Sequence, residues 1–282
     1  MSEPEAPFPK EPPRFRAPDG TIDCHIHILG PYARYPLQAN RSFSAPEGLI
    51  PDYRRVMKVL GIAQCVVVQP SLYGMDNSCT ADAVEQLGAR GVAVFGPEIE
   101  EAELKRLDRI GFRGVRLNLL FKGGVPLEAM EPLAKRLAPY GWHLQFLLDA
   151  RTLPELAPRL RALPVDIVID HMGFMPVSVG LESPAVETMR RLLGEGRTWV
   201  KLSGAYMITD EGYPYSDVAP LARTLLREAP ERCVWGTNWP HPKPRDTMPD
   251  DAVLLDLVPR WTDDAALQAK LMRDNARALY GF

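Results

Sequence analysis

Short β-rich runs alternate eight times with longer helix-like stretches along this chain, and this rhythm limits its possible folds more than any other feature. Two of the runs, residues 66–68 and 167–169, are triplets of valine and isoleucine, which are typical of parallel strands covered on both faces. The predicted strands span residues 21–27, 65–69, 92–96, 114–118, 143–148, 166–170, 198–202 and 233–237. The predicted helices span residues 52–60, 80–89, 100–110, 127–139, 153–163, 184–193 and 218–228, and a C-terminal pair starts at residue 250.

Eight such alternations between residues 21 and 282 predict an α/β protein with a single-domain (β/α)8 TIM barrel, for which about 250 residues is typical. A doubly wound open sheet is the alternative, but no glycine-rich dinucleotide fingerprint opens a helix after any predicted strand. We interpret residues 1–20, which are rich in proline, as an extended arm before the barrel domain of residues 21–282. Such an arm can pack on a neighbouring subunit, so a monomer and a homo-oligomer both stay open.

Overall composition limits the partners of the protein. A chain of 282 residues that is 46% hydrophobic can bury a sizeable core. A net charge of −3 offers no electrostatic footprint for nucleic acid or an anionic membrane surface. The four cysteines lack the paired spacing of a zinc or redox motif, and the N-terminal residues hold no apolar run long enough for a signal peptide or a membrane span. We therefore expect a cytoplasmic protein whose partner is a small molecule.

The predicted strand at residues 21–27 ends with two histidines. Because side chains alternate along a strand, Asp23, His25 and His27 should face one way, and Ile22 and Cys24 the other. Burying two imidazoles on one face costs free energy unless they make polar interactions, so the pair indicates a functional site.

Polar side chains also stand at the ends of the other predicted strands, where the catalytic residues of a barrel lie, and we expect them to converge on one pocket. They are Gln69, Ser71, Glu98, Arg116, Asn118, His171, Lys201, Ser203 and Asn238. Two long loops, residues 30–51 and 239–248, should cover the mouth of the barrel.

Several of these side chains suit substrate binding. Arg116 can hold a substrate carboxylate through bidentate hydrogen bonds. Lys201 should face the barrel interior, where a lysine needs a polar partner. The full set of candidate substrate contacts is Ser71, Gln69, Arg116, Lys122, Lys201 and His241. We interpret His143, at the far end of its strand, and Asp170, facing a neighbouring loop, as structural.

Five short motifs carry a resemblance to a known family. They are Asp23-Cys24-His25-Ile26-His27, Val68-Gln69-Pro70-Ser71, Gly114-Val115-Arg116-Leu117-Asn118, Asp170-His171-Met172-Gly173 and Gly236-Thr237-Asn238-Trp239-Pro240-His241. Together they resemble the 2-pyrone-4,6-dicarboxylate lactonase group of the amidohydrolase superfamily (amidohydrolase family 2). The resemblance implies a barrel hydrolase that acts on the ester bond of a lactone and, in the namesake enzymes, requires no metal. It assigns catalytic roles to His25, His27, His171 and position 238, and substrate contacts to Arg116 and Ser71.

The chain departs from that group at three positions. The group has an aspartate where this chain has Asn238, and asparagine cannot accept a proton near neutral pH. Lys122 and Phe174 stand where the group has arginines. A pocket with fewer guanidinium groups favours a less charged ligand, so we expect a different lactone or related cyclic ester as substrate.

These residues predict hydrolysis without a required cofactor. Arg116 and the histidine pair would polarise the carbonyl, and His171 or one of the pair would accept a proton from a water that Asn238 positions. One alternative is a metal-dependent amidohydrolase or decarboxylase, with one divalent ion, zinc above all, held by His25, His27 and His171. Another is a barrel that binds a small molecule without converting it.

Overall fold

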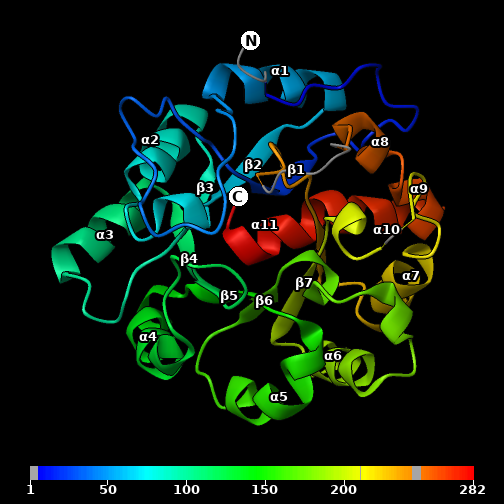
Figure 1. Cartoon of the computed structure of the whole chain (residues 1–282). Coiled ribbons are helices and arrows are strands. Elements are labelled where there is room, and N and C mark those ends of the chain that lie inside the picture. The colour runs from blue at the N-terminus through cyan, green and yellow to red at the C-terminus, as the bar shows by residue number, and fades with distance from the viewer. Residues whose placement is uncertain (1–5, 210, 243–248) are drawn as a thin grey trace.

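A computed structural model describes residues 6–209, 211–242 and 249–282, and it confirms the (β/α)8 barrel (Figure 1). Eight strands form one sheet in the order β1 to β8, and each neighbouring pair along this order is parallel. The strands are β1 (Ile22–Ile26), β2 (Gln64–Val68), β3 (Arg90–Ala93), β4 (Phe112–Asn118), β5 (His143–Leu147), β6 (Ile167–Ile169), β7 (Thr198–Leu202) and β8 (Cys233–Trp235).

Hydrogen bonds between the ends of β1 and β8 close the sheet. The Asn238 N–H donates to His25 O, and the His27 N–H donates to Trp239 O, both at 2.8 Å. Ile26 and Trp239 form a parallel bridge between the same two segments. The loops that follow the first and last strands therefore start side by side, as a closed barrel requires.

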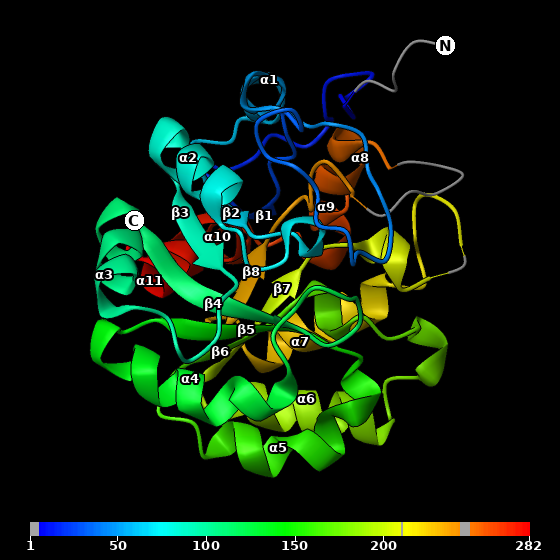
Figure 2. The same cartoon turned by 60° about the vertical axis from the view of Figure 1, so that its left-hand side comes forward.

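Helices cover the outside of the barrel (Figure 2). In the first of them, Tyr53, Val56 and Leu60 are buried at helical spacing, and Gly61 ends the helix in the left-handed conformation that glycine adopts without strain. The helices between the strands are α1 (Ile50–Leu60), α2 (Ser78–Leu87), α3 (Glu101–Ile110), α4 (Met130–Leu137), α5 (Leu153–Arg161), α6 (Pro184–Gly194) and α7 (Ala219–Glu228).

The C-terminal region differs from the predicted pair of helices. It contains α8 (Asp251–Leu255), α9 (Val258–Trp261), α10 (Ala265–Ala269) and α11 (Asn275–Tyr280), with a π-helical turn at Lys270–Asp274. New helices start because the side chain of Asp250 caps α8 at Ala252 N, and that of Asp264 caps α10 at Ala266 N. Hydrophobic spacing alone does not reveal these internal starts.

An apolar cluster fills the N-terminal end of the barrel interior. Its members are Ile22, Cys24, Val66, Val68, Val92, Val168, Trp199, Val234, Ala276 and Tyr280. Tyr280 comes from α11, which crosses the middle of the barrel in Figure 1. The Arg90 guanidinium, at the start of β3, donates to Tyr280 O and Gly281 O and fixes the C-terminus there. Water is thereby excluded from this end, and the polar residues gather at the other.

The regular alternation predicted for residues 21–27 is wrong. Ile22 and Cys24 belong to the interior cluster, whereas Asp23 accepts a hydrogen bond from Tyr53 Oη of α1 on the helix side. The pairing register between β1 and β2 shifts between Asp23 and Ile26. Such a shift re-aims the side chains after it, so His25 turns into the barrel although Asp23 does not.

The described part of the arm, residues 6–20, lies against its own barrel. Trp239 Nε1 donates to Pro7 O, and Phe15 N donates to the carboxylate of Asp256. The guanidinium of Arg55 lies 4.4 Å from the centre of the Phe8 ring. No helix in the described ranges is both long and apolar enough to cross a bilayer.

Candidate active site

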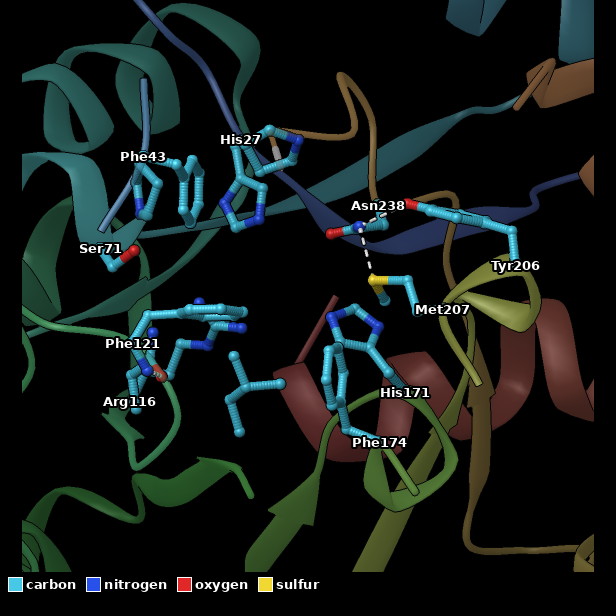
Figure 3. A pocket seen from close by; sticks show the side chains of 14 residues that line it. His27, Phe43, Ser71, Arg116, Phe121, His171, Phe174, Tyr206, Met207 and Asn238 are labelled. Carbon is cyan, nitrogen blue, oxygen red and sulfur yellow. Dashed lines mark hydrogen bonds between the residues drawn. The ribbon is translucent and has the colours of Figure 1, made fainter. Parts of the chain in front are cut away.

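A hollow of about 500 Å³, partly open to solvent, lies at the C-terminal ends of the strands (Figure 3). Most of the strands contribute to it through their last residue or the loop that follows. The residues that line it are His27, Phe43, Pro70, Ser71, Arg116, Asn118, Phe121, Leu147, His171, Phe174, Tyr206, Met207, Asn238 and Pro242. The structure thus brings six of the residues predicted for the pocket, His27, Ser71, Arg116, Asn118, His171 and Asn238, to one place.

His27 and His171 are held by hydrogen bonds that leave one ring nitrogen of each for the pocket. His27 Nδ1 lies 2.7 Å from Val68 O, and because a carbonyl only accepts, this nitrogen carries the hydrogen. His171 Nδ1 lies 2.8 Å from Ser203 Oγ. Burial lowers the pKa of both imidazoles to about 3, so both are neutral at pH 7. His27 therefore offers an unprotonated Nε2, which can accept a proton but cannot polarise a carbonyl as we had expected.

His25 does not line the pocket but lies directly beneath it. Its ring centre is 5.0 Å from that of His27 and 4.5 Å from that of His171. Its Nδ1 is 3.3 Å from both Asp170 Oδ1 and Lys201 Nζ. Burial, followed by the positive charge of Lys201, lowers the pKa of this imidazole well below its usual value. His25 is therefore a neutral part of the floor.

The interpretation of Asp170 as a partner of a neighbouring loop is wrong, because its carboxylate lies inside the barrel. Oδ2 accepts from Arg116 Nε at 2.9 Å and from Gln145 Nε2 at 3.1 Å, and Oδ1 lies 3.6 Å from Lys201 Nζ. Although β6 ends at Ile169, His171 also faces inward, because its φ of 52° takes the chain out of the extended conformation. Two consecutive side chains thus reach the same interior.

Asp170 and Lys201 stabilise one another's charge. Burial alone would raise the pKa of Asp170, but Arg116, His25 and Lys201 hold it well below its usual value. Burial lowers the pKa of Lys201 to about 8, against the opposing effect of Asp170. Lys201 Nζ also donates to Cys24 O and Gln145 Oε1 at 2.8 Å each. The predicted need of Lys201 for polar partners is confirmed, but these contacts place it below the pocket, away from a substrate.

Asn238 presents its amide to the pocket from the loop after β8. Its φ is 68°, a left-handed conformation that non-glycine residues seldom adopt. Its Nδ2 donates to Tyr206 Oη at 2.8 Å and lies 3.9 Å from Met207 Sδ. Figure 3 shows the amide oxygen on the opposite side, facing the hollow.

Three predicted substrate contacts, Gln69, Lys122 and His241, and the predicted strand-end residue Glu98 do not reach the pocket. Gln69 donates to Gly74 O and Asp76 O, so its amide holds its own loop together. Lys122 and Glu98 are exposed to solvent. His241 is buried against Tyr206, and only the first part of its loop, residues 239–242, is described. A position near the end of a predicted strand is therefore not enough to place a side chain in the pocket.

Three phenylalanines form one wall of the pocket. The Phe121 ring lies 5.5 Å from the Phe43 ring and 6.3 Å from the Phe174 ring, each pair edge to face. Asn118 Oδ1 accepts from Leu120 N and Phe121 N and so shapes the loop that carries Phe121. Sequence reasoning missed Phe43 and Phe121, as well as Leu147, Tyr206 and Met207. Their only signal was their place at the end of a strand, as for Leu147, or in a loop after one.

The predicted metal ligands come together only in part. Among the described residues, His25, Asp170 and His171, without His27, bring potential ligand atoms within 4.8 Å of one another. A divalent ion at these atoms would lie beside Arg116 and Lys201, which already neutralise the carboxylate. Repulsion between buried like charges is weakly screened, so this donor set does not fit a divalent ion.

The hollow thus has a histidine after β1, a histidine after β6 and an amide side chain after β8 around it, while His25 lies beneath it. The model of the Amidohydrolase family matches residues 22–282, so the chain belongs to this family.

Individual relatives agree with this assignment. The chain is 36% identical to 2-pyrone-4,6-dicarboxylate hydrolase of Comamonas testosteroni, over 95% of this chain and 92% of the relative. It is 32% identical to D-galactarolactone isomerase of Agrobacterium fabrum, over 93% of this chain and 91% of the relative. A solved apo structure from Agrobacterium tumefaciens superposes with a TM-score of 0.88 at 30% identity, covering 96% of this chain and 98% of that one. The lactonase-like group predicted from the motifs is confirmed.

Proposed function

We propose that the protein hydrolyses the ester bond of a small lactone in the pocket at the C-terminal ends of the strands. One observation carries this proposal: a guanidinium and two neutral imidazoles, those of Arg116, His27 and His171, line the same hollow. Ring opening of a lactone needs a cation or hydrogen-bond donor for the carbonyl oxygen and an acceptor for the proton of water. The relative named as a 2-pyrone-4,6-dicarboxylate hydrolase supports the same chemistry.

Arg116 supplies the positive charge. Its Nε is bound to Asp170, which fixes the direction of the guanidinium, and the rest of the group lies at the pocket wall. The lactone carbonyl oxygen accepts from this group and becomes an oxyanion as water attacks. Removing one such donor typically lowers kcat by about 10²–10³-fold.

His171 acts as the base. Ser203 holds its Nδ1, and its Nε2 takes the proton of a water that also donates to Asn238 Oδ1. The proton then passes to the ring oxygen as the ester bond breaks, so that the products are a hydroxy acid and the neutral enzyme. The reaction needs no metal and no organic cofactor.

The substrate is less charged than a pyrone dicarboxylate. Among the described residues that line the pocket, Arg116 alone carries a full positive charge, and Asp170 compensates it. Phe43, Phe121 and Phe174 offer an apolar wall for the part of the substrate away from the carbonyl. A second carboxylate there would lose its hydration without gaining a cation from these residues.

A panel of lactones with and without carboxylate substituents tests the proposal, with ring opening followed by acid release. Uncharged or monoanionic lactones should be opened by the wild type, and 2-pyrone-4,6-dicarboxylate should be a poor substrate. Rapid turnover of the dicarboxylate would contradict the assignment of substrate class.

A second candidate is isomerisation of a hydroxylated lactone, in which a hydroxyl group of the substrate replaces water. Asn238 favours it, because a site without a carboxylate base benefits from a nucleophile of high effective concentration, about 10⁵–10⁸ M for well-oriented groups. Reaction in ¹⁸O-labelled water separates the two, since hydrolysis incorporates the label and isomerisation does not.

We also propose the cytoplasm as the compartment of this reaction. Four buried, unpaired thiols, Cys24, Cys65, Cys79 and Cys233, support a reducing environment. Fractionation of the source cells, with activity assayed in each fraction, tests it.

A further inference from the structure

We propose that Tyr206 and His241 form a hydrogen-bonded chain, with the Asp251 carboxylate beside His241, that orients the Asn238 amide so that its oxygen and not its nitrogen faces the reacting centre. The effect that we expect on catalysis rests on the proposed function. All three are positioning residues, because they act through Asn238.

The four side chains follow one another from the pocket into the protein. Asn238 Nδ2 is 2.8 Å from Tyr206 Oη, Tyr206 Oη is 2.8 Å from His241 Nδ1, and His241 Nε2 is 3.2 Å from Asp251 Oδ1. All are buried, with exposed fractions of 4% for Asn238, 7% for Tyr206, 2% for His241 and 1% for Asp251. They come from the loop after β7, the loop after β8 and α8.

The carboxylate at the end determines the direction of the whole chain. Asp251 Oδ1 lies 3.2 Å from His241 Nε2 without hydrogen-bond geometry, but an ionised carboxylate at this distance attracts a hydrogen and repels a lone pair, so Nε2 carries the hydrogen and Nδ1 is left as an acceptor. Tyr206 must then donate to His241, and its oxygen accepts from the amide nitrogen of Asn238. In this arrangement the Asn238 amide nitrogen and the Tyr206 hydroxyl both donate to an acceptor.

The flipped amide breaks this pattern. Its oxygen would lie beside Tyr206 Oη, which would turn its hydrogen toward it and away from His241. His241 would then have to donate from Nδ1 and turn the lone pair of Nε2 toward the Asp251 carboxylate. Met207 Sδ, 3.9 Å from the amide nitrogen, has no hydrogen to give to an oxygen in its place. Only one amide orientation is therefore compatible with an ionised Asp251.

Backbone geometry shows that the protein maintains this arrangement against strain. Asn238 and His241 both have left-handed φ values, 68° and 58°, and His241 N donates to Asn238 O at 2.8 Å. Left-handed non-glycine residues are strained and persist only where the surroundings hold them.

The chain matters because of the side chain at position 238. The two oxygens of a carboxylate are equivalent, so an aspartate there needs no orienting partner. An amide has one accepting and one donating end, and the wrong end would offer a hydrogen to the hydrogen of the attacking water.

A double-mutant cycle in kinetics tests this dependence. Tyr206→Phe in the wild type should lower kcat about 10- to 100-fold with KM within about twofold, since the amide is then free to turn. The same change in an Asn238→Asp background should lower kcat less than about threefold. Equal losses in the two backgrounds would overturn the proposal, because a merely structural role for Tyr206 predicts equality.

Side-chain amide NMR gives a readout that needs no substrate. The ¹⁵N–¹H₂ signals of Asn238, assigned by their loss in Asn238→Asp, should shift and exchange faster with solvent in Tyr206→Phe and Asp251→Asn. They should not change in Tyr213→Phe, a matched change at an exposed tyrosine. Unchanged signals in Tyr206→Phe would refute the hydrogen-bonded chain even if the protein turns over no lactone. Failure of this inference and failure of the proposed function can therefore be told apart.

Discussion

Lys201 Nζ lies 3.3 Å from Nδ1 of His25, so an ammonium and an imidazole share the floor of the site with one carboxylate, Asp170. Lys201 and Arg116 approach Asp170 from two sides, and the lysine also donates to Cys24 O of β1 and to Gln145 of β5. One buried side chain from β7 thereby ties the two other strands together. Two fixed cations, Lys201 and Arg116, thus supply at Asp170 the positive charge that a metal ion would bring.

Removing the buried ammonium should destabilise the protein strongly. In Lys201→Met the carboxylate of Asp170 loses one of its two cations, and the cost of breaking a buried ion pair by removing one partner is about 3–5 kcal/mol. Urea unfolding measures the change. Lys270→Met, which removes an exposed ion pair with Glu231, is the control and should change the free energy of unfolding by about 1 kcal/mol or less. A loss of stability in Lys201→Met that is no larger than the loss in the Lys270→Met control would contradict the ion-pair network.

Stability should fall as the pH drops below 6.5. Burial lowers the pKa of His27, His143 and His171 to about 3, so between pH 6.5 and 3 the unfolded chain binds protons that the folded protein does not. Each histidine then removes about 1.4 kcal/mol of stability per pH unit. Asp23 acts in the opposite direction, because burial raises its pKa to about 6, but one group does not offset three.

Unfolding in urea at pH 7, 6 and 5 measures this dependence. In His143→Gln the free energy of unfolding should depend less steeply on pH, by the equivalent of about one proton, because that side chain no longer titrates. A free energy of unfolding that is constant between pH 7 and 5 would show that the three imidazoles are not buried in their neutral forms.

Loss of the proposed base should lower kcat more than it changes KM. His171→Gln keeps a polar side chain but cannot accept a proton, and general bases contribute about 10²–10⁴-fold to rate. Steady-state kinetics on the best lactone of the panel measure both constants. His143→Gln removes an equally buried histidine that lies outside the pocket, and should retain its kcat. Unchanged turnover in His171→Gln would move the base to His27.

Introducing an arginine at the aromatic wall should change substrate preference. Phe174 already has a left-handed φ of 47°, so Phe174→Arg adds no new backbone strain. Hydrogen bonds to charged groups are worth about 1.5–3 kcal/mol, so kcat/KM for a lactone with an added carboxylate should rise about 10- to 100-fold relative to its uncharged analogue. Phe174→Leu is the control for loss of the ring and should not produce this preference.

Chelation should leave the activity intact. Two cations already neutralise Asp170 within the cluster of His25, Asp170 and His171, so zinc has no net negative site to enter. Protein dialysed against a chelator should keep its kcat, and elemental analysis before dialysis should find well below one metal ion per chain. Loss of activity that zinc restores would contradict this prediction.

The barrel was predictable because its signals are periodic. Apolar triplets such as residues 66–68 and 167–169 are recognisable without any knowledge of their neighbours, and all eight predicted strands overlap the observed ones. The C-terminal helices were harder, because Asp264 restarts a helix through a local cap rather than through a change of periodicity.

The candidate site was predictable only to the level of strand ends. His27, His171 and Asn238 lie at the pocket because each follows a strand, and Arg116 because it lies near the end of β4. Asp170 was misplaced because alternation assumes an extended chain, and the left-handed turn at His171 breaks that assumption. Loop residues such as Phe121 and Tyr206 follow no period, and their positions depend on hydrogen bonds that only the folded chain contains.

The bonds that join the first and last strands have a consequence for when the enzyme becomes active. Asp23 accepts from the hydroxyl and the main-chain N–H of Thr237, a residue 214 positions further along the chain. Contacts of such separation are intrinsically slow to form, because a long stretch must be ordered before they do. A growing polypeptide therefore carries its histidine pair for most of its synthesis without the asparagine that faces it. If Asn238 is needed for catalysis as proposed, incomplete copies should be catalytically silent, and activity should appear only when the two ends of the fold have met.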